Sequence, residues 1–279
     1  MESIPGGRGA LATLLVLVAL LTVACGSGTT SAAAGKFTPS TPGVLTVVTT
    51  DVPSPGFWEG TPGHVTGGFE FELAKALAQR LGLKTVRIKI EHFHRIVQGQ
   101  LGDADLSLDL ITPTSERSRS LTFSAPYLES APTVVTGAET SVPDLATAQG
   151  LRWGAVRATT FVETIAGRIR PDTPTRIYDN TADMMRGLES RQVDAVLLDL
   201  PAAVATADHS GGRLRAAAQL PVPETIAAAL PKGSDNEQAV SSAFRAFTAD
   251  GTIKRLLRVW VGSDAANAES SIPLLETIL

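Results

Sequence analysis

The sequence predicts an α/β fold with mostly parallel sheets. A β-branched run at 44–50 has the composition of a buried strand and is followed by a helical pattern at 67–82. The apolar residues of that helix recur at a helical period: Phe69, Leu73, Ala76, Leu77 and Leu81. A second helical segment at 180–191 precedes an apolar strand at 192–199. Strands that alternate with helices in this way are typical of α/β proteins.

The remaining segments continue the alternation. Further strands are expected at 85–90, 104–108, 133–135 and 226–233, and closing helices at 235–247 and 252–261. Glu70 and Glu72 stand in the first turn of the helix at 67–82, where acidic side chains suit the helix dipole. His92 and His94 have no cysteine or further histidine near them, so a zinc site is not expected.

The composition argues against a nucleic-acid-binding protein. The formal net charge is −4, and no basic stripe indicates nucleic-acid binding. We expect no metal site and no cofactor.

The N-terminus has the pattern of a secretory signal. The run 11–24 is almost wholly apolar, too short for a membrane span, and preceded by Arg8. It ends at Leu21-Thr22-Val23-Ala24-Cys25, which is similar to a lipobox, and Cys25 is the only cysteine. We therefore expect a signal peptide at 1–24, lipid attachment at Cys25 and a flexible tether over 25–42, rich in Gly, Ser, Thr and Ala. An ordinary secretory signal with a stray cysteine is the alternative.

The stretch 105–127 (DLSLDLITPTSERSRSLTFSAPY) carries the chemistry. An apolar strand leads into a polar loop that contains Thr112 and Arg117. An arginine past the carboxyl end of a strand is well placed to bind a carboxylate with two parallel hydrogen bonds. The Thr112 hydroxyl, five residues earlier, can reach the same anion. The alternative is a surface arginine that pairs with Glu116 or caps a helix.

This stretch resembles the signature of the family 3 extracellular solute-binding proteins, the polar-amino-acid receptors of ABC importers. The family pattern has VDL, then a threonine and an arginine, then DFSxPY; here Asp105-Leu106, Thr112, Arg117 and TFSAPY match it. Asp105 precedes Arg117 by twelve residues, as in the family. Other matching segments are GFEFELAKALAQRLG, RQVDAVLLD and ADGTIKRLLRVWVG, so the resemblance spans roughly 44–262.

The resemblance implies a type II periplasmic-binding-protein-like fold with a ligand cleft between two lobes. Lobe 1 would comprise 43–134 and 226–263, and lobe 2 would comprise 135–225. Residues 264–279 form a C-terminal extension beyond the family pattern, and the sequence suggests no role for it.

The resemblance also implies the ligand contacts. Arg117 would bind an amino-acid carboxylate, and Asp199, at the end of the strand at 192–199, would bind the α-ammonium. A capping role for Asp199 at the start of the next helix is the alternative. The helix start after 153–158 would supply backbone amides, although Thr159 and Phe161 replace the family's glycine and threonine. The full expected set is Asp51, Phe57, Trp58, Asp109, Leu110, Thr112, Arg117, Arg157, Thr160, Phe161 and Asp199.

Two interpretations stay open within this set. Phe57 and Trp58 either cover the apolar part of a ligand or pack the loop. Asp109 stands where the family usually has a small residue, so it either receives a basic ligand side chain or pairs with Arg157 or Arg117.

The predicted function is the substrate-binding component of an ABC importer, which binds a polar amino acid or a similar small zwitterion and is not an enzyme. Its partners would be the ligand, a permease and, through a lipid anchor, the outer face of the cell membrane. A ligand-sensing lipoprotein and a dehydratase-type enzyme are the alternatives.

Overall fold

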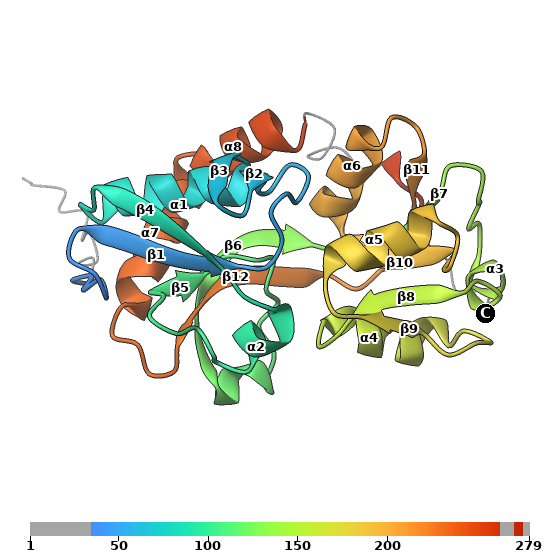
Figure 1. Ribbon diagram of the computed structural model, residues 1–279, viewed down its shortest axis with the longest axis horizontal. Helices are drawn as coiled ribbons and strands as arrows, with labels where there is room; N and C mark the ends of the chain where they lie inside the picture. The colour runs from blue at the N-terminus through green and yellow to red at the C-terminus, as the bar shows by residue number, and fades with distance from the viewer. Residues whose placement is uncertain (1–34, 263–270, 276–279) are drawn as a thin grey trace, which may run out of the picture. The chain divides into compact units, whose positions relative to one another are not determined.

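A computed structural model describes residues 35–262 and 271–275 of the chain (Figure 1). The expected signal peptide, Cys25 and most of the expected tether lie outside the described residues. Two five-stranded sheets and a two-stranded hairpin make up the β-structure of the described part. We call the first sheet with its covering helices lobe 1, and the second sheet with its helices lobe 2.

The sheet of lobe 1 is mixed. Its strands in spatial order are β4 (Thr85–Ile90), β1 (Val44–Thr49), β5 (Leu106–Ser107), β12 (Glu224–Pro231) and β6 (Leu121–Ser130). β1 runs parallel to β4 and β5, whereas β12 is antiparallel to β5 and β6. The hairpin of β2 (Glu59–Thr61) and β3 (His64–Gly67) was not expected, because the sequence there suggested only a loop.

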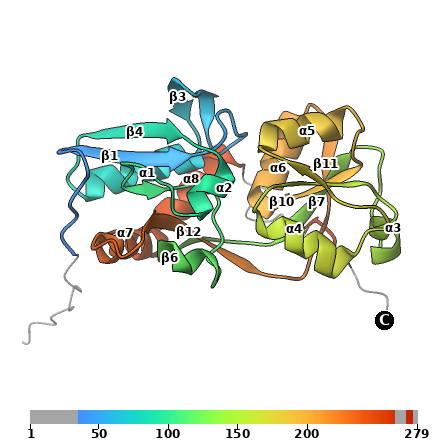
Figure 2. The ribbon, with the colours of Figure 1, turned by 60° about the horizontal axis from the view of Figure 1, so that its bottom comes forward.

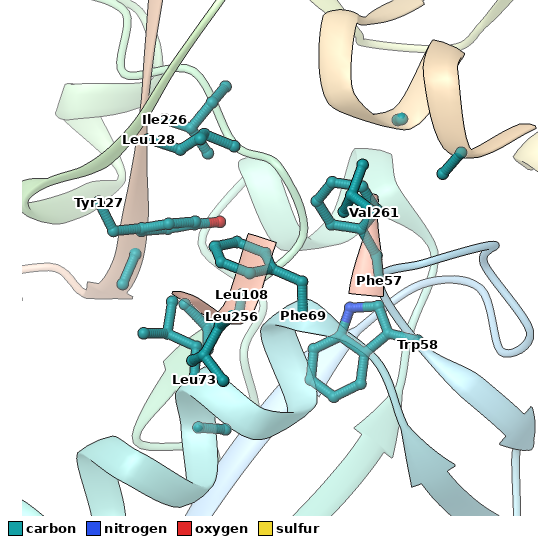
Figure 3. Packing of buried hydrophobic residues seen from close by; sticks show 14 of the residues in the cluster. Phe57, Trp58, Phe69, Leu73, Leu108, Tyr127, Leu128, Ile226, Leu256 and Val261 are labelled. Carbon is teal, nitrogen blue, oxygen red and sulfur yellow. The ribbon is translucent and has the colours of Figure 1, made fainter. Parts of the chain in front are cut away.

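Helices cover this sheet where their apolar faces meet it. They are α1 (Phe69–Arg80), α2 (Phe93–Val97), the 3₁₀ turn η1 (Arg117–Arg119), α7 (Glu237–Ala249) and α8 (Thr252–Trp260). Phe69, Leu73 and Leu77 of α1 are fully buried, as the period predicts. Gly68, before α1, has φ 111°, and a Cβ there would lie 2.1 Å from the carbonyl oxygen of Phe57. Only glycine lets the loop after β1 pack this closely on the helix start; Figure 3 shows Phe57 beside Phe69 in the resulting cluster.

The sheet of lobe 2 has the order β11 (Leu214–Gln219), β7 (Pro132–Gly137), β10 (Ala195–Asp199), β8 (Trp153–Val156) and β9 (Arg176–Tyr178). β8 is parallel to β9 and β10, and β7 is antiparallel to β10 and β11. Its helices are α3 (Leu145–Gln149), α4 (Thr160–Thr164), the π-helical turn η2 (Ile165–Ile169), α5 (Thr181–Glu189) and α6 (Leu200–His209).

The α/β class and the two-lobed fold are confirmed, but the sheets are not mostly parallel. Each has two parallel and two antiparallel pairings, because the strands next to the lobe connections run against their neighbours. The chain changes sheet between Ser130 and Pro132 and returns between Gln219 and Glu224. The two connections meet where Glu224 pairs with Ser130. In Figure 2, β6 and β12 both reach from lobe 1 toward lobe 2.

The C-terminal segment 271–275 extends the sheet of lobe 2. The amide of Gln219 donates to the carbonyl of Pro273 (2.8 Å), and the amide of Leu275 donates to the carbonyl of Gln219 (2.7 Å). Leu274 forms a parallel bridge with Gln219, and the Leu275 side chain is buried in the lobe 2 core. This part of the extension therefore covers the outer edge of β11.

In the described ranges, no helix combines the length and apolar character needed to cross a membrane. Nor do the described His, Cys, Asp and Glu residues form a group of three able to hold a metal ion. His92 and His94 stack with ring centroids 5.7 Å apart.

Candidate functional site

A cavity of about 530 Å³ lies between the two lobes. Lobe 1 contributes the loop after β1, the start of α2 and the segment from Asp109 to Arg117. Lobe 2 contributes the end of β8, the starts of α4 and α5, and α6. Most of the expected ligand residues border it: Asp51, Phe57, Trp58, Asp109, Leu110, Thr112, Arg117, Thr160, Phe161 and Asp199.

Arg117 is buried and joins the two lobes. Its guanidinium donates to the carbonyl of Thr112 (2.7 Å) and, across the cavity, to the carbonyl of Ala158 (2.9 Å). The guanidinium carbon lies 5.3 Å from the ring centroid of Phe93, a cation–π distance. Burial lowers the pKa of Arg117, which nearby Glu224 and Asp199 partly counteract. Arg117 forms no ion pair with a described carboxylate, Glu116 included, so the surface-arginine alternative is wrong.

Thr112 contacts Arg117 through its backbone. Its hydroxyl donates instead to Glu224 Oε2 at 2.8 Å. The expectation that this hydroxyl faces an anion beside Arg117 is therefore not met in this structure, because the hydroxyl's proton is already donated to the carboxylate of Glu224.

Asp199 ends β10 at a buried position. It is the N-cap residue of α6, as the alternative expected, but its side chain makes no capping hydrogen bond there. Its Oδ1 is buried without a hydrogen-bond partner in the described structure. Burial, with a further contribution from Glu224, raises the pKa of Asp199 from its usual 3.8 to about 7. An unpartnered buried carboxylate oxygen at the edge of a cavity is suited to a cationic ligand group.

Asp109 and Asp51 lie together on lobe 1. Asp109 Oδ1 accepts from the Thr49 hydroxyl (2.8 Å), the Thr50 hydroxyl (3.0 Å) and the Thr50 amide (3.2 Å). The same Thr50 hydroxyl lies 3.4 Å from Asp51 Oδ2, which also accepts from the Thr181 amide of lobe 2 at 3.1 Å. Burial raises the pKa of Asp109 well above its usual range, and the Glu70 and Asp51 charges add to the effect. Asp109 pairs with neither Arg157 nor Arg117.

Arg157 does not border the cavity, so its expected ligand contact is wrong. Its guanidinium pairs with Asp179 at 3.0 Å, and both side chains are exposed. Arg157 follows the last residue of β8 in the turn before α4, and its backbone amide donates to the carbonyl of Tyr178 (2.9 Å), next to its partner Asp179.

The aromatic residues divide into two groups. Phe57 and Trp58 are fully buried, and Trp58 Nε1 donates to Glu70 Oε2 at 2.7 Å, so both pack the wall of the cavity (Figure 3). Phe93 and Phe161 are half-buried and border the cavity; Arg117 lies over the Phe93 ring, and Phe161 also packs against the lobe 2 core. Phe161 follows Thr160 at the start of α4, a helix of five residues.

Comparison with known proteins identifies the family to which this two-lobed chain belongs. The family model for bacterial extracellular solute-binding proteins, family 3, matches residues 46–263, which is most of the chain. The chain belongs to this family. The L-cystine-binding protein TcyJ of Escherichia coli strain K12 is 25% identical over 213 residues, which cover 75% of this chain and 79% of that protein. An ancestral arginine-binding protein, solved with arginine, is 28% identical with a TM-score of 0.67 over 79% of this chain and 99% of that one.

Another solved relative is the ancestral amino-acid-binding protein AncCDT-1, a precursor of cyclohexadienyl dehydratase. It is 25% identical, with a TM-score of 0.66 over 78% of this chain and 95% of that one. The family is one of solute-binding proteins, and this chain is therefore a solute-binding protein with an interlobe cavity.

Sequence reasoning missed Glu70, which organises the lobe 1 side of this family 3 cavity. Its buried carboxylate accepts from Trp58 Nε1, from the Leu110 amide (2.9 Å) and from the Tyr127 hydroxyl. It thereby fixes Leu110, whose φ of 48° is unusual for a leucine. Burial raises the pKa of Glu70 despite these donors. A sequence signal existed: Ala74, Leu77 and Ala78 share its helix face, and all are buried.

Proposed function

We propose that the cavity binds one α-amino acid, with Arg117 holding the carboxylate and Asp199 the α-ammonium. The observation that carries this proposal is the buried Oδ1 of Asp199, which lies in the same cavity as the buried Arg117; among the described residues, Oδ1 has no hydrogen-bond partner and Arg117 has no carboxylate partner. A zwitterion taken out of water needs both charged ends paired, and these two residues supply opposite charges from opposite lobes.

Arg117 retains donors for this task. A guanidinium has five N–H groups, and two backbone carbonyls account for two of them here. A ligand carboxylate can use the remaining donors or replace the Ala158 carbonyl. Because Asp199 lies on lobe 2 and Arg117 on lobe 1, ligand bound in this way favours lobe closure.

The proposed role is binding without turnover. Glu70 is the most deeply buried carboxylate at the cavity, and three donors already engage its oxygens, so it is poorly placed to exchange a proton with a ligand. We propose further that the protein delivers its ligand to an ABC permease while it is anchored through Cys25 to the outer face of the cell membrane. The similarity to an L-cystine-binding protein and to an arginine-binding protein supports an amino-acid ligand.

A thermal-shift screen of the mature protein tests the amino-acid proposal. The panel contains the standard amino acids, cystine and ornithine, each beside its decarboxylated amine where one exists. At a ligand concentration of about 100 times Kd, binding to the folded state adds about 2.7 kcal/mol of stability, which raises Tm by several degrees. We expect at least one α-amino acid to raise Tm and its amine to have little effect. A panel without any stabilising amino acid would contradict the proposal.

A further inference from the structure

We propose that the ligand carries a cationic side chain, a guanidinium or an ammonium, and that Asp109 is the residue that selects it. This inference rests on the proposed function, because it assigns the part of the ligand that lies beyond the carboxylate and the α-ammonium.

The cavity contains more acid than its own cations neutralise. Three of its carboxylates already have cationic partners: Glu91 with Arg95, Asp179 with Arg157 and Glu189 with Arg213. Glu70 forms no ion pair with a described residue, but three hydrogen-bond donors engage it. Asp51, Asp109 and Asp199 border the cavity without forming an ion pair in the described structure, and Arg117 is the corresponding unpaired cation.

The charge balance in the cavity distinguishes neutral amino acids from basic amino acids as ligands. A neutral amino acid supplies one carboxylate and one ammonium, which Arg117 and Asp199 would bind, and it leaves the lobe 1 acids without a cation. A basic amino acid supplies a second cation for that side. Because lobe closure removes water from the cavity, an ionised carboxylate left without a partner there is costly, and burial already raises the pKa of Asp109 in the free protein. A ligand cation beside Asp109 would stabilise its ionised form, whereas a neutral ligand side chain would not.

The geometry assigns the second cation to Asp109. In the described structure, the three hydrogen bonds to this side chain all end on Oδ1, so Oδ2 is left for a ligand. Asp51 lies on the other side of the Thr50 hydroxyl and adds negative charge, but its Oδ2 is tied to the Thr181 amide. Phe161 borders the same cavity as a half-buried residue, and the aliphatic stem of a basic side chain can pack against it, whereas the Phe93 ring already has the Arg117 guanidinium 5.3 Å from its centroid.

Calorimetry at pH 8 with arginine, lysine, citrulline and glutamine tests the inference on the unaltered protein. Citrulline matches arginine in shape but has a neutral ureido group. We expect arginine or lysine to bind about 10- to 1,000-fold more tightly than citrulline, because the loss of a buried charged partner typically has an effect of this size. If citrulline and glutamine bind as tightly as the basic amino acids, the charge-selection inference is wrong. The proposed binding of an α-amino acid by Arg117 and Asp199, which we call the clamp, then still stands.

The variant Asp109→Asn tests whether Asp109 is the residue that selects a cationic ligand side chain. It should reduce arginine binding at least about tenfold and change citrulline binding little. Asp103→Asn is the matched control, since Asp103 is an exposed acid of the same segment outside the cavity. Equal loss for arginine and citrulline would mean that Asp109 only holds the loop at Thr49 and Thr50. If no amino acid binds but agmatine does, the clamp itself fails, and the two failures are thereby distinguished.

Discussion

The guanidinium of Arg117 donates a 2.9 Å hydrogen bond to the carbonyl of Ala158, so a lobe 1 side chain is tied to a lobe 2 loop. Ala158 has φ 64°, a left-handed conformation in the turn between β8 and α4. The residue expected to bind the ligand carboxylate therefore also holds the lobes together in the described structure. Hinge opening for ligand exchange must break this contact, and a carboxylate beside Arg117 can compensate for its loss.

Glu70 is predicted to be structurally essential although it lies at the cavity. Glu70→Ala leaves the Trp58 Nε1, the Leu110 amide and the Tyr127 hydroxyl without their shared acceptor. We expect the free energy of unfolding to fall by about 2–3 kcal/mol in urea denaturation. Glu72→Ala is the matched control on the same helix, because Glu72 forms an ion pair only with half-exposed Lys75 and should matter by less than about 0.5 kcal/mol. Equal effects of the two substitutions would contradict the assigned role.

Two neighbouring leucines test whether the C-terminal segment 271–275 packs against lobe 2. Leu275 is 5% exposed in the lobe 2 core, whereas its neighbour Leu274 is 54% exposed. Leu275→Ala should lower the free energy of unfolding by about 2–3 kcal/mol, and Leu274→Ala should change it by less than about 0.5 kcal/mol. Thermal denaturation followed by circular dichroism measures both. If Leu275→Ala is as stable as the unaltered protein, the segment 271–275 does not dock in solution.

Ligand binding should depend on pH through Asp199. Its pKa of about 7 means that the free protein carries a protonated, neutral Asp199 below neutrality. The α-ammonium needs the ionised form, so binding should strengthen as pH rises from 5 to 8, by about 100-fold in Kd. Calorimetry across this range measures the effect, and Asp199→Asn should lose the part that comes from Asp199. Asp109→Asn separates the contribution of Asp109, whose pKa is also raised by burial. Constant affinity from pH 5 to 8 would exclude a titrating Asp199 from the site.

The same residue should reduce the stability of the ligand-free protein at high pH. The folded pKa of Asp199, about 7, lies above its usual 3.8, so the folded state binds this proton more tightly than the unfolded state. The resulting stabilisation is complete at pH values below the unfolded pKa and is lost as pH rises through about 7. Asp199→Asn should therefore raise Tm at pH 8 and change it little at pH 4. A lower Tm at pH 8 would contradict this sign.

Sequence patterns predicted elements with a strong local signal, and they located the two clamp residues through motif spacing. The burial of α1 follows from its apolar period, and Arg117 and Asp199 both border the cavity. The patterns failed where the decisive partner is distant in the chain. Glu70 was expected only to suit the helix dipole, because nothing local identifies Leu110 and Tyr127 as its donors. The pairing of 271–275 with Gln219 was equally unreadable, since no local period encodes it.

Membrane attachment is a separate prediction. Cys25 is the only cysteine of the chain and follows an apolar signal-like run. Cys25→Ala should move the protein from the membrane fraction to the medium or leave the signal uncleaved, because the thiol carries the anchor. Ser27→Ala is the control and should fractionate as the unaltered protein does. A Cys25→Ala protein that is processed normally and stays in the membrane would rule out lipidation at this site.

The clamp is tested most directly by calorimetry on Arg117→Ala and Asp199→Ala at pH 8, with the amino acid that gives the largest thermal shift. Circular dichroism confirms folding, and Arg157→Ala serves as the control because Arg157 is exposed and does not border the cavity. Removing one partner of a buried charge pair costs about 3–5 kcal/mol, so each clamp variant should weaken binding by about two to three orders of magnitude. A folded Asp199→Ala protein that binds within a few-fold of the unaltered protein would contradict the clamp.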